Sequence, residues 1–165
     1  MRPSSIDSLA LSLSPGGSNP GGAAALLAGV LESAMDAIIT VDEQQRIVMY
    51  NRAAEEVFGW SRQEVLLQPL EKLIPDRFRP NHARHVESYS GTGVSSRRMG
   101  VRRVIHGLRR NGEEFPLDAS ISVLHTPEGK LFTAIVRDIT ELDRLQREQA
   151  DNDARLRESQ RRLQA

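Results

Sequence analysis

Two histidines, His82 and His85, come nearest to the spacing of a metal site. They lie three positions apart in a helix expected over residues 76–90, so both side chains would share one face of that helix. A closed zinc site needs four ligands, and Glu87 does not share that face. The pair alone gives little support for a metal site, and the alternative for both histidines is an ordinary solvated or hydrogen-bonded helix position.

Residue combinations typical of catalysis are missing from the chain. It contains no cysteine, which excludes disulfides, thiolate metal sites and cysteine-linked cofactors, including flavin photochemistry that uses a cysteine. It contains no nucleophile elbow, no glycine-rich phosphate loop and no metal-ligand motif. We therefore expect a regulatory chain and not an enzyme.

Composition narrows the class further. The chain has 165 residues, of which 39% are hydrophobic and only 4% aromatic, so one domain with a mostly aliphatic core and tails is expected. The 22 basic and 22 acidic residues balance, and no aromatic residues alternate with the arginines between 97 and 110. Both observations argue against a nucleic-acid-binding protein. Those arginines suit either an anionic partner or a solvated strand edge. No apolar run approaches the roughly 20 residues that span a bilayer, and a cytoplasmic location is expected.

Three consecutive strands form the centre of the predicted fold. Residues 99–110, 114–124 and 130–138 are strand-like, with Asn111-Gly112 as a two-residue type I′ turn between the first two. In the middle strand, Phe115, Leu117, Ala119, Ile121 and Val123 fall on one face and polar residues on the other. This period of two predicts a sheet with one buried face.

Shorter elements precede this sheet. Residues 1–22 are rich in Ser, Pro and Gly and are expected to form a disordered leader, followed by a flanking helix over 23–35 that either dimerises or caps the domain. Residues 37–42 and 46–50 predict a hairpin. Asn51 is a good N-cap for a helix that Gly59 ends, and Ser61 with Glu64 has capping-box spacing for the next one.

A single polar helix is expected after the sheet, over residues 139–165. Four leucines follow a heptad, while three further core positions of that heptad are polar. The leucines are Leu142, Leu145, Leu156 and Leu163. We predict a two-stranded coiled coil that makes the chain a homodimer, the alternative being a solvated single helix.

This order of elements, together with five segments, resembles the PAS family over about residues 26–145. The segments are 36–42, 50–55, 58–61, 107–116 and 137–141. The resemblance implies an α+β PAS fold over 36–138, with a five-stranded antiparallel sheet, helices on one face and the two flanking helices. It implies a sensory input domain without catalytic residues, whose homodimer acts on a downstream effector such as a histidine kinase or a cyclic-dinucleotide enzyme.

The connection from sheet to final helix has a physical rationale of its own. The carboxylate of Asp138 can accept hydrogen bonds from the start of a helix that begins near Thr140. A displacement of the sheet would then move the helix. We expect Asp138, Ile139 and Thr140 to couple the signal, the alternative for Asp138 being a plain N-cap.

The same resemblance suggests what the domain binds. The segment around His82 is similar to that of oxygen-sensing haem PAS domains, which implies His82 as an iron ligand, Arg103 as a contact to bound gas, and Leu117 and Ile121 as an apolar wall. Arg98 stands where those domains have an apolar residue. Three alternatives therefore remain: a sensor of another small molecule, a haem gas sensor, and an unliganded dimerisation module.

Overall fold

The computed structural model of the chain describes residues 20–82, 84, 96–99 and 105–164. An N-terminal helix, α2 (Pro20–Ser33), precedes the domain and a long helix, α6 (Thr140–Leu163), follows it. The elements between them are β1 Ala37–Val41, β2 Ile47–Tyr50, α3 Arg52–Phe58, α4 Arg62–Val65, the 3₁₀ helices η1 Leu70–Leu73 and η2 Asp76–Phe78, β3 Ser96–Met99, β4 Ile105–Leu108, β5 Glu114–Thr126 and β6 Gly129–Asp138.

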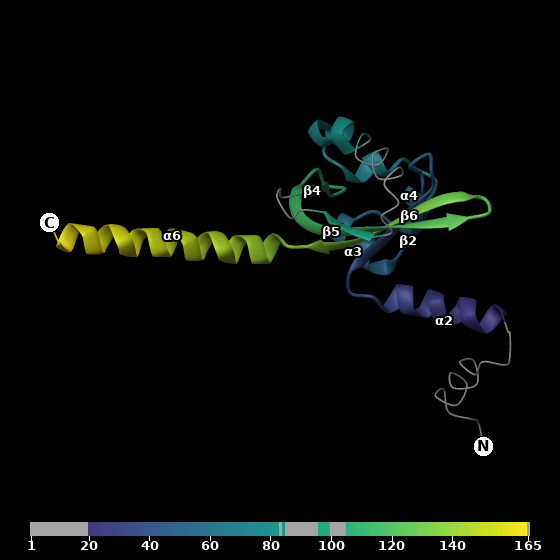
Figure 1. Ribbon diagram of the computed structural model, residues 1–165, viewed down its shortest axis with the longest axis horizontal. Helices are drawn as coiled ribbons and strands as arrows, with labels where there is room; N and C mark the ends of the chain where they lie inside the picture. Colours follow the sequence, from purple (N-terminus) through teal and green to yellow (C-terminus); the bar gives the residue numbers. More distant parts are fainter. Residues whose placement is uncertain (1–19, 83, 85–95, 100–104, 165) are drawn as a thin grey trace, which may run out of the picture.

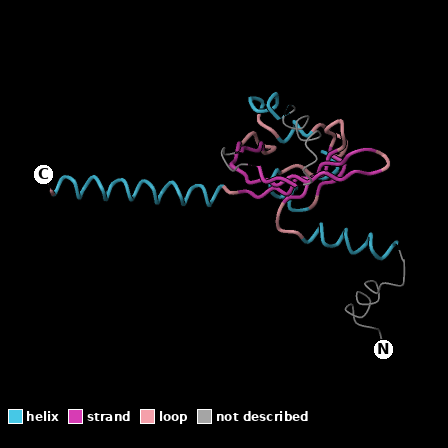
Figure 2. The backbone as a smooth tube through the Cα atoms, viewed as in Figure 1, coloured by secondary structure: helices cyan, strands magenta, loops and turns pink. Residues whose placement is uncertain are grey.

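One antiparallel sheet organises the domain (Figures 1 and 2). Its strand order is β2-β1-β6-β5-β3. Strand β4 also pairs with β5, but with residues 114–117, whereas β3 pairs with residues 119–122. The six strands that the described residues form therefore fill five positions. This confirms the predicted five-stranded antiparallel sheet and the α+β class.

The core lies on one face of this sheet, which we call the inner face. Phe115, Leu117 and Ala119 of β5 are buried on it, as the period of two predicts, and Phe58 of α3 packs edge-on against Phe115 with ring centroids 5.4 Å apart. Val65 of α4 and Leu73 of η1 belong to the same buried cluster. The helices therefore cover the inner face, because packing against it removes their apolar side chains from water.

Local signals in the sequence explain how the first helices begin and end. Asn51 caps α3 by accepting a hydrogen bond from the Ala54 amide, and Gly59 ends it with φ +79°. The Glu64 carboxylate accepts from both the amide (2.9 Å) and the hydroxyl (3.0 Å) of Ser61 at the start of α4. All three predicted caps are confirmed.

The predicted turn at Asn111-Gly112 is wrong in type. Leu108 and Glu114 are the last residues paired within the strands. Beyond them the Arg109 amide donates to the Glu113 carbonyl (2.9 Å) and closes a loop of residues 110–112, in which the Gly112 amide donates to the Arg109 carbonyl (3.0 Å). Gly112 has φ +86°, whereas Asn111 does not have the positive φ that a type I′ turn requires. The loop thus contains three residues and not two, since one left-handed residue after an ordinary turn suffices to close it.

Other boundaries also differ from the sequence prediction. Helix α2 begins at Pro20, inside the range expected for the leader. The strand expected over 99–110 is present as β3 and β4, and residues 100–104 lie outside the described residues. The long helix expected over 76–90 begins as η2 and continues as helix at 79–82 and 84, and the rest of that range lies outside the described residues.

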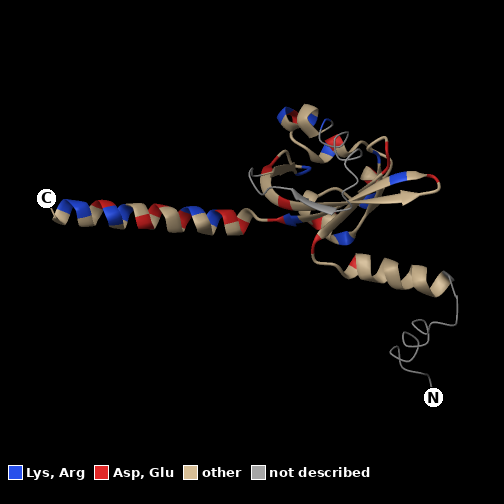
Figure 3. Ribbon diagram, viewed as in Figure 1, with Lys and Arg blue, Asp and Glu red and all other residues tan. Residues whose placement is uncertain are grey.

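The two flanking helices lie outside the sheet and the helices that cover it. Helix α6 continues from β6 and projects from the sheet as a straight rod, and α2 lies beside the domain on a short connection (Figure 1). Figure 3 shows that α6 carries many charges of both signs, whereas α2 is nearly free of them.

Candidate functional site

The junction between β6 and α6 is held by the carboxylate of Asp138. One of its oxygens accepts hydrogen bonds from the Thr140 amide (2.9 Å) and the Thr140 hydroxyl (2.5 Å). Ile139 occupies the cap position and donates its own amide to the Pro116 carbonyl of β5 (3.1 Å). The three residues predicted to couple sheet and helix therefore lie together. Asp138 accepts from the first amide of α6 although it directly precedes the N-cap residue Ile139, so it takes the role that an N-cap side chain usually has.

The second oxygen of Asp138 binds Arg109, which comes from the loop between β4 and β5. The guanidinium Nη2 lies 2.6 Å from this oxygen, and Nη1 donates to the Val57 carbonyl at the end of α3. The same guanidinium lies 3.9 Å from the ring centroid of Phe115, and its Nε lies 3.3 Å from the Glu113 carboxylate. Arg109 thus connects the last turn of α3, the inner-face core and the start of α6.

Limited exposure strengthens this ion pair. The side chains of Arg109 and Asp138 are only 19% and 27% exposed, so water screens their attraction less than on an open surface. Burial acts to raise the pKa of Asp138, but the hydrogen bonds from Thr140 and Arg109 outweigh it and hold that pKa below its ordinary value. The carboxylate therefore stays charged at neutral pH and keeps both of its partners.

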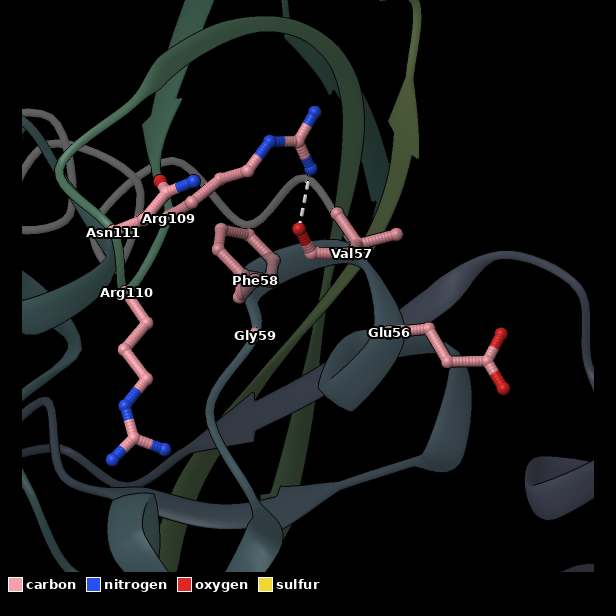
Figure 4. Close-up of a pocket in the computed structure, with 7 residues that line it drawn as sticks. All are labelled: Glu56, Val57, Phe58, Gly59, Arg109, Arg110 and Asn111. Carbon is pink, nitrogen blue, oxygen red and sulfur yellow. Dashed lines mark hydrogen bonds between the residues drawn. The ribbon is translucent and has the colours of Figure 1, made fainter.

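A shallow pocket of about 460 Å³ lies beside Arg109. The end of α3 and the loop between β4 and β5 form its walls, and Arg109 and Arg110 extend to opposite sides of Phe58 (Figure 4). The lining residues are Glu56, Val57, Phe58, Gly59, Arg109, Arg110 and Asn111. Arg110 is already paired with Glu64 (2.9 Å), and Arg109 with Asp138. Both cations on the pocket walls are thus neutralised by the protein itself.

A second set of contacts ties α2 to the domain. The side chain of Asn51, 1% exposed, accepts at Oδ1 from the amides of Ile38 (2.8 Å) and Ala54 (3.1 Å). Its Nδ2 donates to the carbonyls of Leu31 (3.0 Å) and Asp36 (3.1 Å). Asn51 therefore joins the last turns of α2 to the starts of β1 and α3.

An ion pair connects the start of β1 with the end of β6. Arg137 binds the Asp36 carboxylate through two nitrogens, at 3.0 and 2.8 Å. The hydrogen bond from Arg137 lowers the pKa of Asp36, against the opposing effect of burial. Consecutive residues of β6 thus point in opposite directions, Arg137 toward the connection from α2 and Asp138 toward Arg109.

The residues expected to hold haem are described only in part. His82 is half-buried in the helical segment after η2, and Leu117 (8% exposed) and the half-buried Ile121 lie on the inner face of β5. Arg103 and His85 lie outside the described residues. One imidazole on a helix and an apolar inner face are the donor and the wall that haem needs, so the described residues fit haem in kind. Within the described part of the chain, no three His, Asp or Glu side chains are grouped as metal ligands.

The four leucines of the predicted coiled coil are all solvent-exposed in the single chain. Leu142, Leu145, Leu156 and Leu163 are 53%, 49%, 61% and 84% exposed. Helix α6 has no buried residue, and it projects away from the sheet (Figure 1). None of the helices formed by the described residues is long and apolar enough to cross a bilayer.

Arg109 lies at the centre of this junction, but the sequence analysis places it only within the basic stretch and the segment 107–116 and does not predict its contacts. Its sequence signal was its place directly after a strand and before a tight turn. That place brings its backbone to the end of α3, where the Arg110 amide donates to the Phe58 carbonyl (2.8 Å).

Comparisons of the sequence with known families and of the structure with solved structures both find PAS domains. The family model described as PAS fold matches residues 25–139. The chain is 34% identical over 115 residues to the sensor protein FixL of Bradyrhizobium diazoefficiens, covering 70% of this chain and 23% of that protein. It is 28% identical over 120 residues to the oxygen sensor protein DosP of Escherichia coli, covering 72% of this chain and 15% of that protein.

Further relatives include a cell-division control histidine kinase, PdhS of Brucella abortus, at 30% identity over 119 residues, 72% of this chain and 11% of that protein. The crystal structure of a PAS domain from Colwellia psychrerythraea superposes with a TM-score of 0.62 at 19% identity, covering 72% of this chain and 98% of that one. The chain spans less than a quarter of the length of each of the three curated relatives.

Proposed function

The chain belongs to the PAS family, and on that basis we propose that it is a sensory input domain that passes a ligand, redox or partner signal through α6 to an effector. One observation carries the proposal: the Asp138 carboxylate is divided between Arg109 (2.6 Å) and the first residue of α6 (2.5 and 2.9 Å). The effector class suggested by the relatives is a histidine kinase, as the name of PdhS states; a cyclic-dinucleotide enzyme is the other class that the family resemblance implies.

The coupling follows from what each partner of Asp138 is attached to. Arg109 holds the end of α3 and lies over Phe115, so a change in the packing of the inner face moves its guanidinium. Asp138 must follow Arg109 or lose a charge-assisted hydrogen bond, and either response alters the start of α6. A difference of 1–3 kcal/mol between two states is about the size of coupling that such a junction can transmit.

The output is proposed to act in a homodimer. The exposed leucines of α6 would be buried in a two-stranded coiled coil, and the polar residues at three core positions would weaken it enough for two registers to interconvert. A shift at Thr140 would then favour one register over the other.

A chimera with a histidine kinase effector tests the coupling. We expect Asp138→Ala to change basal autophosphorylation several-fold while circular dichroism shows a folded domain, because the start of α6 loses its link to Arg109. Asp153→Ala, which removes an exposed carboxylate further along α6, is the matched control and should leave activity unchanged. Basal activity within twofold of the parent for Asp138→Ala would count against the proposal.

A second candidate is a haem gas sensor, favoured by the half-buried His82 and by the relative whose name is oxygen sensor protein. His82 would supply the imidazole ligand and Leu117 and Ile121 the apolar wall; bound haem iron would supply the gas-binding chemistry.

The test for haem is an absorption titration of the purified chain with haemin. A sharp Soret band that His82→Ala abolishes and His125→Ala, at an exposed position, preserves is the result expected for this candidate. An unshifted, featureless spectrum rejects haem and leaves a sensor of another small molecule or an unliganded dimerisation module. A change in thermal stability on screening metabolites then separates these two.

A further inference from the structure

The half-buried imidazole of His106 on β4 is a titratable group that the junction at Asp138 does not use. Its Nδ1 is buried and has no hydrogen-bond partner among the described residues. Its ring is stacked on the ring of Phe78 in η2, with centroids 5.9 Å apart and 13° between the two planes. A buried ring nitrogen without an acceptor nearby fits the neutral imidazole, because a proton placed on it would be a buried donor without a partner.

Two oppositely charged side chains lie beside this stack. Arg77 of η2 forms an ion pair with Glu114 at the start of β5, and its guanidinium carbon lies 4.4 Å from the ring centroid of Phe78. The hydrogen bond from Arg77 lowers the pKa of Glu114, whose carboxylate also interacts with the charge of the protonated His106. Glu114 therefore stays charged over the whole range in which histidines titrate. On η1, which also lies against β4, the charged residues are Glu71 and Lys72.

Protonation of His106 acts on both of these contacts. The imidazolium repels the guanidinium of Arg77 and attracts the carboxylate of Glu114, so two cations compete for one anion. The new N–H finds no acceptor in the present position of the ring, which favours a turn of the ring away from Phe78. Both effects weaken the contacts that hold η2 against β4 and β5.

His106 is also close to the junction with α6 along the chain and across the sheet. It pairs with Pro116 of β5, whose carbonyl accepts a hydrogen bond from the Ile139 amide (3.1 Å). Arg109, which binds Asp138, follows His106 by three residues. A displacement of β4 therefore reaches the start of α6 both through the backbone and through the ion pair.

We propose that His106 is a proton-binding site through which the domain senses acidification: protonation separates η2 from β4 and β5 and displaces the junction between Arg109 and Asp138. This inference rests on the proposed sensory function and names the proton as a signal. Its first step, the release of η2, takes place within the domain and requires no effector.

An NMR titration of the full chain between pH 8 and pH 5 tests this first step. We expect the amide signals of residues 76–82 to titrate together with the ring signals of His106. His106→Phe keeps a flat ring against Phe78 but cannot take up a proton, and it should reduce the shift of those amide signals at least fivefold. His125→Phe makes the same change at an exposed histidine and should leave the titration unchanged. A titration that persists in His106→Phe, or that His82→Phe abolishes instead, overturns the proposal.

A second variant tests the competition for Glu114 without altering the aromatic stack. In Glu114→Gln, Arg77 loses its anion at every pH, so the amide signals of residues 76–82 at pH 8 should resemble those of the parent at pH 5. Glu128→Gln, which changes an exposed carboxylate in the loop between β5 and β6, is the matched control and should behave like the parent. Signals of Glu114→Gln that match the parent at pH 8 and still titrate contradict the proposal.

The histidine kinase chimera separates the proton signal from the sensory function itself. The ratio of parent to His106→Phe autophosphorylation should change at least threefold between pH 8 and pH 6, which removes the pH dependence of the kinase from the comparison. A constant ratio, in a chimera whose activity does respond to Asp138→Ala, overturns the proton signal alone. A chimera that responds to neither substitution overturns the sensory function as well.

Discussion

The ion pair between Arg109 and Asp138 should contribute a measurable coupling energy to the stability of the domain. Its atoms are 2.6 Å apart and its side chains are 19% and 27% exposed, between the limits of a surface pair and a buried one. A charge-assisted hydrogen bond in such a setting is worth about 1.5–3 kcal/mol. We therefore predict a coupling energy of about 2 kcal/mol from a double-mutant cycle of Arg109→Met and Asp138→Asn.

These substitutions isolate the pair. The methionine keeps an apolar chain over Phe115, and the asparagine keeps an oxygen that accepts from Thr140. Arg109→Met alone should cost more than the coupling energy, because the Val57 carbonyl also loses its donor. The free energy of unfolding is measured in urea at pH 7 through the fluorescence of Trp60, the single tryptophan.

The pair between Asp36 and Arg137 supplies the matched comparison. Its closest atoms are 2.8 Å apart, but the Arg137 side chain is 67% exposed, so its coupling should be smaller and should weaken more in salt. A coupling between Arg109 and Asp138 that is no larger than this one would refute the view that limited exposure strengthens their ion pair.

Four further outcomes are expected. Because its folded pKa is lowered, Asp138 contributes stability that is fully present above the unfolded pKa of 3.8 and is lost as pH falls through that value toward the lower folded pKa, so Asp138→Asn should flatten the acid limb of a stability-against-pH curve. Gly107→Ala should destabilise by about 1–3 kcal/mol in urea unfolding, since its Cβ would lie 2.8 Å from the Phe115 ring. Gly29→Ala meets nothing within 4 Å and should instead raise helix content in circular dichroism. Asn51→Ala should cost about 3 kcal/mol and speed amide exchange in α2, because four backbone groups, one buried and three half-buried, lose their partner.

Features encoded by neighbouring residues were predictable. The alternation in β5 follows from the period of a strand, and the caps at Asn51, Gly59 and Ser61 follow from side chains that reach only their own helix. The turn type at Asn111 was not predictable in this way. A two-residue and a three-residue loop both accept Asn-Gly, and strand register decides between them.

Composition and local periodicity were enough to predict a cysteine-free chain with a mostly aliphatic core, a sheet buried on one face and a polar helix beginning near Thr140, whereas the PAS fold was predicted from the resemblance of five segments. The arginine that pairs with Asp138 could not be read from local sequence, because the pair joins distant segments of the chain. Arg109 and Asp138 are 29 residues apart, and the sequence offers several other arginines. The antiparallel pairing of β4, β5 and β6 brings the loop beside β4 to the end of β6, and this proximity selects Arg109 as the partner.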